Sequence, residues 1–184
     1  MLTELISNLS SDPFNPQLNF DVAVEYERLN QTASAVSFYL RTAEYGGDDS
    51  LLVYASLLKL AKCFENQTGR DYTVTNCILQ AIAYMPERAE GHFLMSRWHE
   101  RKANWQECYT YACVGLKAYG SGVLPVDVEY PGIYGLLFEK AVSAYWVGRA
   151  SESLELFRHL LTLDIAPEYR ASCEDNLRRL NVSV

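Results

Sequence analysis

Small and apolar residues recur in the middle of the chain with the spacing of one face of an α-helix. They occupy positions i, i+4, i+7 and i+8, and a helix-breaking residue follows each set. The first set is Val74, Ile78, Ala81 and Ile82, followed by Pro86. The second set begins 34 positions later and is Cys108, Ala112, Gly115 and Leu116, followed by Gly120. Because small side chains let a neighbouring helix approach closely, both sets predict packing faces within a repeated two-helix unit.

The rest of the chain aligns on the same two-helix skeleton. We predict repeat units at residues 16–49, 50–86, 87–120 and 132–166, within one repeat domain that spans residues 13–181. Glycine and proline are concentrated between Tyr119 and Pro131, which predicts an extended connection before the fourth unit. The last helix, 167–181, begins with Pro167 and is rich in charged residues, as expected of a helix that caps a repeat array. Residues 1–12 form an N-terminal segment with the spacing of a short amphipathic helix.

A period of 34 residues in helix–turn–helix units is that of the tetratricopeptide repeat (TPR), and the chain resembles this family over roughly residues 14–180. The resemblance implies an all-α fold, a TPR-like right-handed superhelix of antiparallel helix pairs with a C-terminal capping helix. More narrowly, residues 78–116 and 138–157 are similar to TPR regions that precede glycosyltransferase domains in marine phage and bacterial proteins. The sequence contains no DxD metal motif, so the transferase activity is not carried over.

Composition and charge disfavour nucleic acid and membranes as partners. The 16 Lys and Arg residues against 23 Asp and Glu residues give a net charge of −7, the wrong sign for phosphate backbones and anionic lipid. No apolar run approaches the roughly 18–20 residues of a bilayer span, and the first residues do not read as a secretory signal. Five cysteines without CxxC spacing are typical of free thiols in a reducing compartment. We therefore expect a cytoplasmic protein, in a bacterial host if a phage encodes it.

The sequence offers little that would support catalysis or metal binding. His92 and His99 could share a helix face, but seven residues separate them by about 10 Å along the axis, too far to share one ion. Nothing in the sequence pairs Cys63 or Cys173 with a base that would activate it. We therefore expect no catalytic residue, no metal and no cofactor, and no enzyme activity of the chain itself.

The resemblance, and not the spacing, implies a binding surface, because in TPR proteins the first helix of each pair lines a concave groove. Aligning the units transfers groove positions from the family to this chain. They are Arg28, Lys62, Phe93, Arg97, Arg101, Phe138, Tyr145 and Trp146. Aromatic anchors beside guanidinium groups are typical of interface hot spots. We expect the groove to hold a peptide or partner protein, with acidic residues meeting Lys62, Arg97 and Arg101.

Three functions are compatible with these predictions. The first is a non-catalytic adaptor or scaffold that binds its partner through the groove. The second is an accessory subunit, or a detached TPR region, of a glycosyltransferase system, in which the partner is a separately encoded modifying enzyme. The third is a phage virion or assembly component that forms homo-oligomers through its convex faces. The sequence leaves the partner, the binding surface, the oligomeric state and the source organism open.

Overall fold

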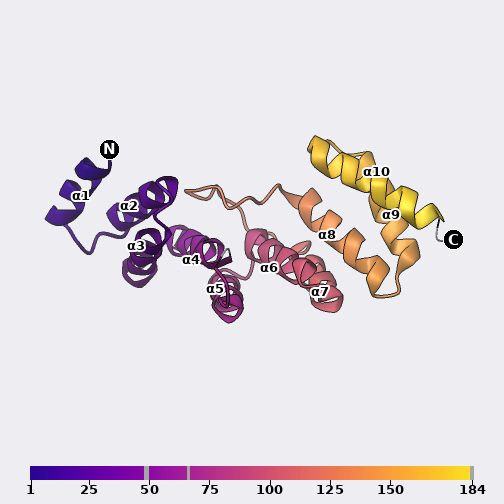
Figure 1. Cartoon of the computed structure of the whole chain (residues 1–184), viewed down its shortest axis with the longest axis horizontal. Coiled ribbons are helices and arrows are strands. Elements are labelled where there is room, and N and C mark those ends of the chain that lie inside the picture. The colour runs from indigo at the N-terminus through magenta and orange to yellow at the C-terminus, as the bar shows by residue number, and fades with distance from the viewer. Residues whose placement is uncertain (48–49, 66, 183–184) are drawn as a thin grey trace. The chain divides into compact units, whose positions relative to one another are not determined.

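The computed structural model describes residues 1–47, 50–65 and 67–182, and all regular structure in these ranges is helical (Figure 1). The helices are α1 (Leu2–Ser11), α2 (Pro16–Arg28), α3 (Thr32–Tyr45), α4 (Ser50–Glu65), α5 (Asp71–Tyr84), α6 (Ala89–Arg101), α7 (Trp105–Gly115), α8 (Ile133–Trp146), α9 (Ala150–Leu161) and α10 (Pro167–Val182). The predicted all-α fold is confirmed. The predicted end of the first repeat at residue 49 lies outside the described residues.

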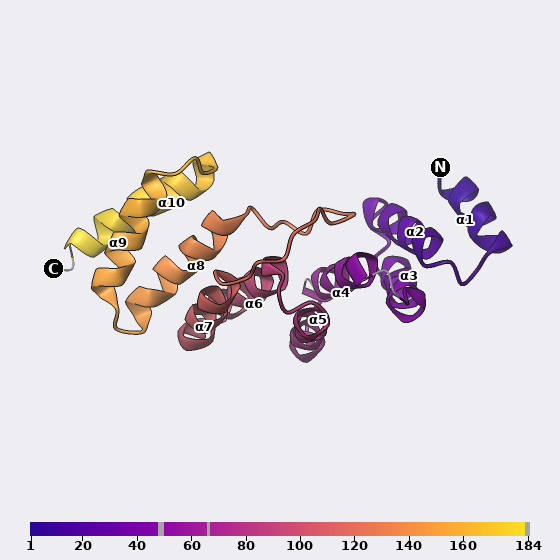
Figure 2. The same cartoon turned by 180° about the vertical axis from the view of Figure 1, so that it is seen from behind.

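Successive helices pair into hairpins. Helix α2 packs on α3, α4 on α5, α6 on α7 and α8 on α9, and we call these pairs repeats 1 to 4 (Figure 2). The chain forms two compact units, each of which contains two repeats. The N-terminal unit comprises Met1–Pro86 and Ser121–Val128, with repeats 1 and 2. The C-terminal unit comprises Glu87–Gly120 and Glu129–Val184, with repeats 3 and 4 and the last helix, α10.

The second helix of every repeat buries residues at the same three positions, i, i+4 and i+7. In repeats 2 and 3 these are Val74, Ile78 and Ala81, and Cys108, Ala112 and Gly115. In repeats 1 and 4 they are Ala35, Tyr39 and Thr42, and Ser153, Phe157 and Leu160. The packing face that the 34-residue period indicates in the middle of the chain therefore recurs in all four hairpins.

Among the residues that the structure describes, the turn inside each hairpin holds one residue in the left-handed backbone region. These residues are Asn30 (φ 57°), Gly69 (φ 75°), Ala103 (φ 54°) and Gly148 (φ 81°). In repeats 1, 3 and 4 the next backbone N–H donates to the carbonyl five residues earlier. The bonds are Gln31 to Tyr26 (2.9 Å), Asn104 to His99 (2.9 Å) and Arg149 to Ala144 (2.8 Å). Such bonds satisfy carbonyls at the end of the first helix while the chain reverses direction.

A polar network connects three helices of the N-terminal unit. The Tyr39 hydroxyl on α3 donates to Glu27 Oε2 on α2 at 2.7 Å, and Lys59 Nζ on α4 lies 2.6 Å from Glu27 Oε1. Tyr39 and Lys59 are buried, and the Tyr39 ring packs edge-on against Phe20 with ring centroids 5.7 Å apart. Burial, together with the bond to Glu27, raises the pKa of Tyr39. The buried ammonium is thus paired, as a buried charge must be.

Helix α10 covers the end of repeat 4 in the C-terminal unit. Its Cys173 and Leu180 are buried in one cluster with Ala141 of α8 and with Phe157 and Leu160 of α9. Its exposed positions include charged residues, Glu168, Glu174, Arg178 and Arg179. The helix therefore combines an apolar inner face with a charged outer face, which is the structure that a terminal cap requires.

No helix or strand forms in the stretch from Leu116 to Gly132, all of which is described. Its start is fixed within the C-terminal unit, because the backbone N–H groups of Tyr119 and Gly120 donate to the Glu87 carbonyl at 3.1 and 2.8 Å. This stretch contains the region in which glycine and proline predicted an extended connection.

Candidate functional site

Two cavities in the C-terminal unit share the helix α8. The first has a volume of about 270 Å³ and lies among α6, α8 and α10. Its lining consists of Arg97, Glu100, Phe138, Glu139, Glu168, Tyr169 and Ser172. The second has a volume of about 140 Å³ and lies among α8, α9 and α10. Its lining consists of Val142, Tyr145, Trp146, Phe157, Asn176, Arg179 and Leu180.

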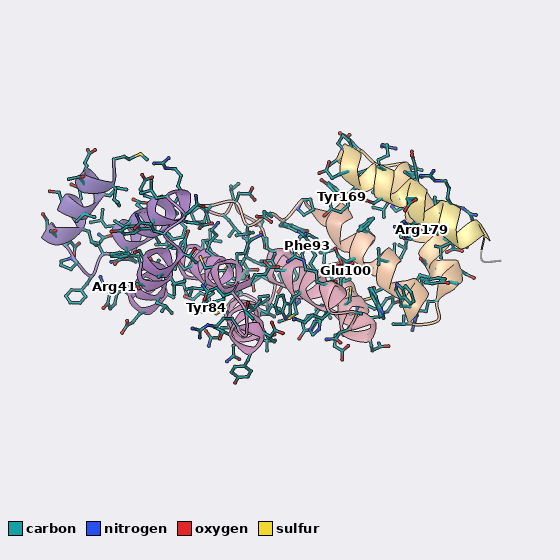
Figure 3. The ribbon with its side chains drawn as sticks, in the orientation of Figure 1. Arg41, Tyr84, Phe93, Glu100, Tyr169 and Arg179 are labelled. Carbon is teal, nitrogen blue, oxygen red and sulfur yellow. The ribbon has the colours of Figure 1, made fainter. Side chains whose placement is uncertain are left out.

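One face of α8 supplies residues to both cavities. Phe138, Val142 and Tyr145 follow the i, i+4, i+7 spacing that places side chains on one side of a helix. The residues that follow two of them, Glu139 and Trp146, extend this face. We call this surface, with the α6 and α10 residues that line the two cavities, the α8 face. Figure 3 shows Glu100 on α6, and Tyr169 and Arg179 near opposite ends of α10.

Aromatic contacts hold the wall of the first cavity in place. The Phe138 ring packs edge-on against Phe157 and Tyr169, with ring centroids 5.9 and 5.1 Å away. Tyr169 is also contacted edge-on by Tyr134 at 5.2 Å. Edge-to-face pairs stabilise by about 0.5–1.5 kcal/mol each beyond their buried area. The capping helix therefore fixes the position of the Phe138 side chain at the cavity.

Glu139 is a buried carboxyl group at the first cavity, and only 4% of the residue is exposed. Within the described part of the chain its side chain has one hydrogen-bond donor, the Cys108 thiol, with Sγ 3.9 Å from Oε2. Burial, and then the nearby charge of Glu100, raise the pKa of Glu139 to about 8, against the opposite effect of Arg97 and Arg101. Near neutral pH this carboxyl group is therefore mostly protonated. About half of it is ionised at a pH of about 8.

Arg97 lies on the other side of the first cavity and is half-buried. Its guanidinium carbon is 5.5 Å from the centroid of the Phe93 ring, a cation–π distance. No ion pair involves Arg97 among the residues that the structure describes. Phe93 itself is fully buried and packs against Tyr130, with ring centroids 5.3 Å apart.

Trp146 and Tyr145 stand at the second cavity with large exposed areas, 58% and 37% of each residue. The Trp146 ring stacks on Trp105 of α7, with centroids 5.1 Å apart and planes 13° from parallel. Tyr145 meets Trp146 edge-on at 5.4 Å. These contacts fix the orientation of an exposed aromatic pair.

Of the residues predicted for the groove, the structure brings four together on the α8 face. Arg97 and Phe138 line the first cavity, and Tyr145 and Trp146 line the second. Arg101, on the last turn of α6, is exposed and lines neither cavity. Phe93 offers no surface to a partner in this structure, because it is fully buried beneath the Arg97 guanidinium.

The other two predicted groove residues belong to the N-terminal unit. Arg28, at the end of α2, is exposed and pairs with buried Glu25 at 2.8 Å. The hydrogen bond from Arg28 and its charge lower the pKa of Glu25. Lys62 is half-buried on α4. Arg28 thus already neutralises a carboxylate of its own helix.

Sequence reasoning placed Glu100 in the groove by family alignment, but it missed Glu139 and Glu168 of the first cavity and the contribution of α10. Glu139 interrupts the otherwise apolar run Leu136, Leu137, Phe138, and an acid at that position was a usable signal. Glu168 and Tyr169 gave no such signal. The sequence predicts the final helix only as a cap, and residue spacing does not show which of its side chains face α6 and α8.

The cysteines and histidines that the sequence offers for catalysis or metal binding lie in packed surroundings. Burial raises the pKa of Cys63 and Cys173 to about 11 and that of Cys108 to about 12, so these thiols stay protonated near neutral pH. His92 and His99 both pack against the Tyr111 ring, at 6.4 and 5.6 Å. Across the described ranges no three His, Cys, Asp or Glu side chains gather to hold a metal, and no helix is long and apolar enough to cross a membrane.

The chain has the TPR-like class of fold, a repeat of paired helices. No protein-family model matches the sequence, and no curated protein does. Among solved structures, MamA has 10% sequence identity and a TM-score of 0.65, with 88% of this chain and 85% of that chain covered. A protein from Podosopora anserina described as a kinesin light chain with nearly identical TPR-like repeats has 16% identity and a TM-score of 0.60, covering 90% and 86%. A thermophilic TPR protein of Thermus thermophilus has 16% identity and a TM-score of 0.56, covering 96% and 88%.

Proposed function

We propose that the chain is a non-catalytic interaction module that binds a peptide or a segment of a partner protein on the α8 face of its C-terminal unit. The observation that carries the proposal is the position of Trp146, an exposed and orientationally fixed aromatic residue beside a cavity. A large aromatic side chain left in water at a concave surface is typical of an interaction site. The TPR-like fold supports the same proposal, since helical repeats present extended binding surfaces.

The α8 face combines features that recognise side chains. The second cavity offers apolar contact through Val142 and Phe157, with Trp146 at its edge, and a buried apolar anchor of the partner would displace water there. The first cavity offers charged groups together with the rings of Phe138 and Tyr169. Neighbouring apolar and polar cavities allow a segment to be bound by one side chain and oriented by another.

Paired substitutions test this proposal. Partners are purified from the native host with the tagged full chain, identified by mass spectrometry and titrated by calorimetry. We expect the double substitution Arg97→Ala and Trp146→Ala to weaken binding by about tenfold or more, because truncated hot-spot residues typically cost about 2 kcal/mol or more.

The N-terminal unit offers a matched control. Arg41 lies 5.1 Å from the Phe38 ring centroid, as Arg97 lies over Phe93, and Tyr72 is an exposed aromatic residue on α5. The double substitution Arg41→Ala and Tyr72→Ala should leave the affinity unchanged. Equal affinities for both double variants and the native chain would exclude the α8 face as the binding surface.

The same purification separates the alternatives suggested by the sequence. Recovery of a separately encoded glycosyltransferase would favour the accessory-subunit function. Recovery of phage structural proteins, together with larger assemblies in mass photometry, would favour a virion or assembly component. Our proposal does not depend on which of these proteins is the partner, because it concerns the surface that binds it.

A further inference from the structure

The first cavity contains a buried acid that lacks a strong hydrogen-bond donor. Glu139 is buried, and across the described residues the Cys108 thiol, 3.9 Å away, is the one donor to its side chain. Buried carboxylates are normally paired with a cation or with several N–H or O–H donors, because an unpaired buried charge is costly. Glu139 instead lines an open cavity of about 270 Å³. A stronger donor from outside the chain can therefore reach Glu139 through the cavity.

The other groups of the cavity favour a cation. Its lining contains three acids, Glu100, Glu139 and Glu168, and one base, Arg97. The Arg97 guanidinium lies over the Phe93 ring, 5.5 Å from the centroid. Phe138 and Tyr169 add aromatic rings, which attract cations and also contact alkyl chains. At a pH above about 8, where Glu139 is ionised, an anion would meet more negative than positive charge here, so a cation is the better match.

We infer that the first cavity receives a lysine or arginine side chain of the bound partner, with Glu139 as its counter-charge. This inference rests on the proposed function, because it specifies the partner chemistry of the same α8 face. The alkyl stem would pack against Phe138 and Tyr169, and the ammonium or guanidinium group would donate to the Glu139 carboxylate. This reverses the expectation from sequence that acidic residues of the partner meet Arg97. In this arrangement the charge of Arg97 favours the ionised form of Glu139, because it lowers the pKa of that carboxyl group, so its loss would still weaken binding.

Binding should depend on pH, because only the ionised Glu139 pairs with a cation. The charged and titratable groups that face it are Glu100, Arg97 and Arg101 on α6, Cys108 on α7, and Glu168 and Tyr169 on α10. Since the pKa of Glu139 is about 8, a smaller fraction is ionised at each lower pH. Linkage then predicts that affinity falls by about tenfold per pH unit well below that pKa.

Side-chain analogues test the inference without a partner. The full chain, with ¹³C-labelled glutamate and tyrosine, is titrated with n-butylammonium and, separately, with n-propylguanidinium, at constant ionic strength. Both probes stay cationic throughout the pH range of the experiment. We expect saturable shifts of Glu139 and Tyr169 signals, about twenty-fold tighter binding at about pH 8.5 than at about pH 6.5, and a lowered Glu139 pKa at saturation. Whichever probe binds more tightly identifies lysine or arginine as the natural side chain.

Three substitutions make the test specific. Glu139→Gln should abolish saturable binding, read from the Tyr169 signal. Glu155→Gln, which removes an exposed charge on α9 outside the cavity, should change nothing. Glu100→Gln removes a charge that raises the pKa of Glu139 and should move the pH midpoint of binding downward. This third variant keeps the test valid if Glu139→Gln fails to fold, as circular dichroism would show.

The outcomes for the cavity and for the proposed function are separable. Absence of saturable binding at about pH 8.5, binding that survives Glu139→Gln, or preferential binding of n-butyrate over both cations would overturn the inference. Probe binding at Glu139, combined with partner binding that ignores Arg97→Ala and Trp146→Ala, would support the inference about the cavity and overturn the proposed function. Partner binding that depends on Arg97 and Trp146, combined with no probe binding, would support the proposed function and overturn the inference about the cavity.

Discussion

Glu139 shows how one buried residue can make the stability of the fold depend on pH. Its pKa is raised from 4.5 to about 8 by burial and by Glu100, so the folded state holds the proton more tightly than the unfolded state. Because the folded chain binds this proton more tightly, protonation of Glu139 contributes stability that is fully present below about pH 4.5, the pKa in the unfolded chain. That stability is lost as the pH rises to about 8, the pKa in the folded chain. The C-terminal unit therefore contains an ionisable group that destabilises it as the pH rises. A strongly shifted pKa is a common feature of functional sites and agrees with the ligand site that we propose at Glu139.

At the residue scale we predict that Glu139→Gln changes how stability depends on pH. Between about pH 4.5 and 8, the free energy of unfolding of the native chain should fall relative to that of the variant, by up to about 1.4 kcal/mol per pH unit. Urea unfolding at several pH values measures the difference. Glu155→Gln should follow the native curve, and parallel curves for Glu139→Gln and the native chain would show that Glu139 has no raised pKa.

At the scale of the elements, the hairpins depend on small residues where helices approach closely. A Cβ atom at Gly115 of α7 would lie 2.8 Å from both His92 Cβ and Leu136 Cδ2, on α6 and α8. Ala81 occupies the equivalent position of α5 and is fully buried. The two residues are 34 positions apart in the sequence, so the period identified two equivalent buried positions of the fold.

We predict that Gly115→Leu and Ala81→Asp each destabilise the chain by roughly 2 to 4 kcal/mol. The first forces extra atoms into a filled contact, and the second buries a charge without a partner. Thermal unfolding followed by circular dichroism measures the effect. Thr110→Leu and Ala83→Asp place the same side chains at exposed positions of the same helices and should shift the melting temperature little. Unchanged melting of the first two variants would refute the assigned packing faces.

At the scale of the whole molecule, the chain consists of two compact units, each held together by its own internal contacts. Each unit has its own buried core, with Tyr39 and Tyr54 among the fully buried residues of the first and Phe157 and Leu160 among those of the second. In repeat proteins, stability is close to a sum of repeat and nearest-neighbour terms. A local defect should therefore be felt mainly in the unit that contains it.

Hydrogen exchange of full-length variants tests this expectation. In Gly115→Leu, amide exchange should accelerate in α6, α7 and α8, while α2, α3 and α4 keep protection close to that of the native chain. In Ala81→Asp, exchange should accelerate in α4 and α5, with α8 and α9 little changed. Equal acceleration in all helices for either substitution would show that the chain unfolds as one cooperative body.

The sequence by itself determined the helical class, the repeat and its packing face, because these follow from local rules. The 34-residue spacing of Val74 and Cys108 reports which side of a helix is buried, and breakers such as Gly148 report where it ends. Through its resemblance to the TPR family, the sequence also predicted Arg97 and Trp146 as groove residues. Only the tertiary structure decided that Phe93 is buried and that Glu139 faces a cavity completed by α10. Burial and pKa depend on which distant helices meet a side chain, and no spacing along one chain contains that information.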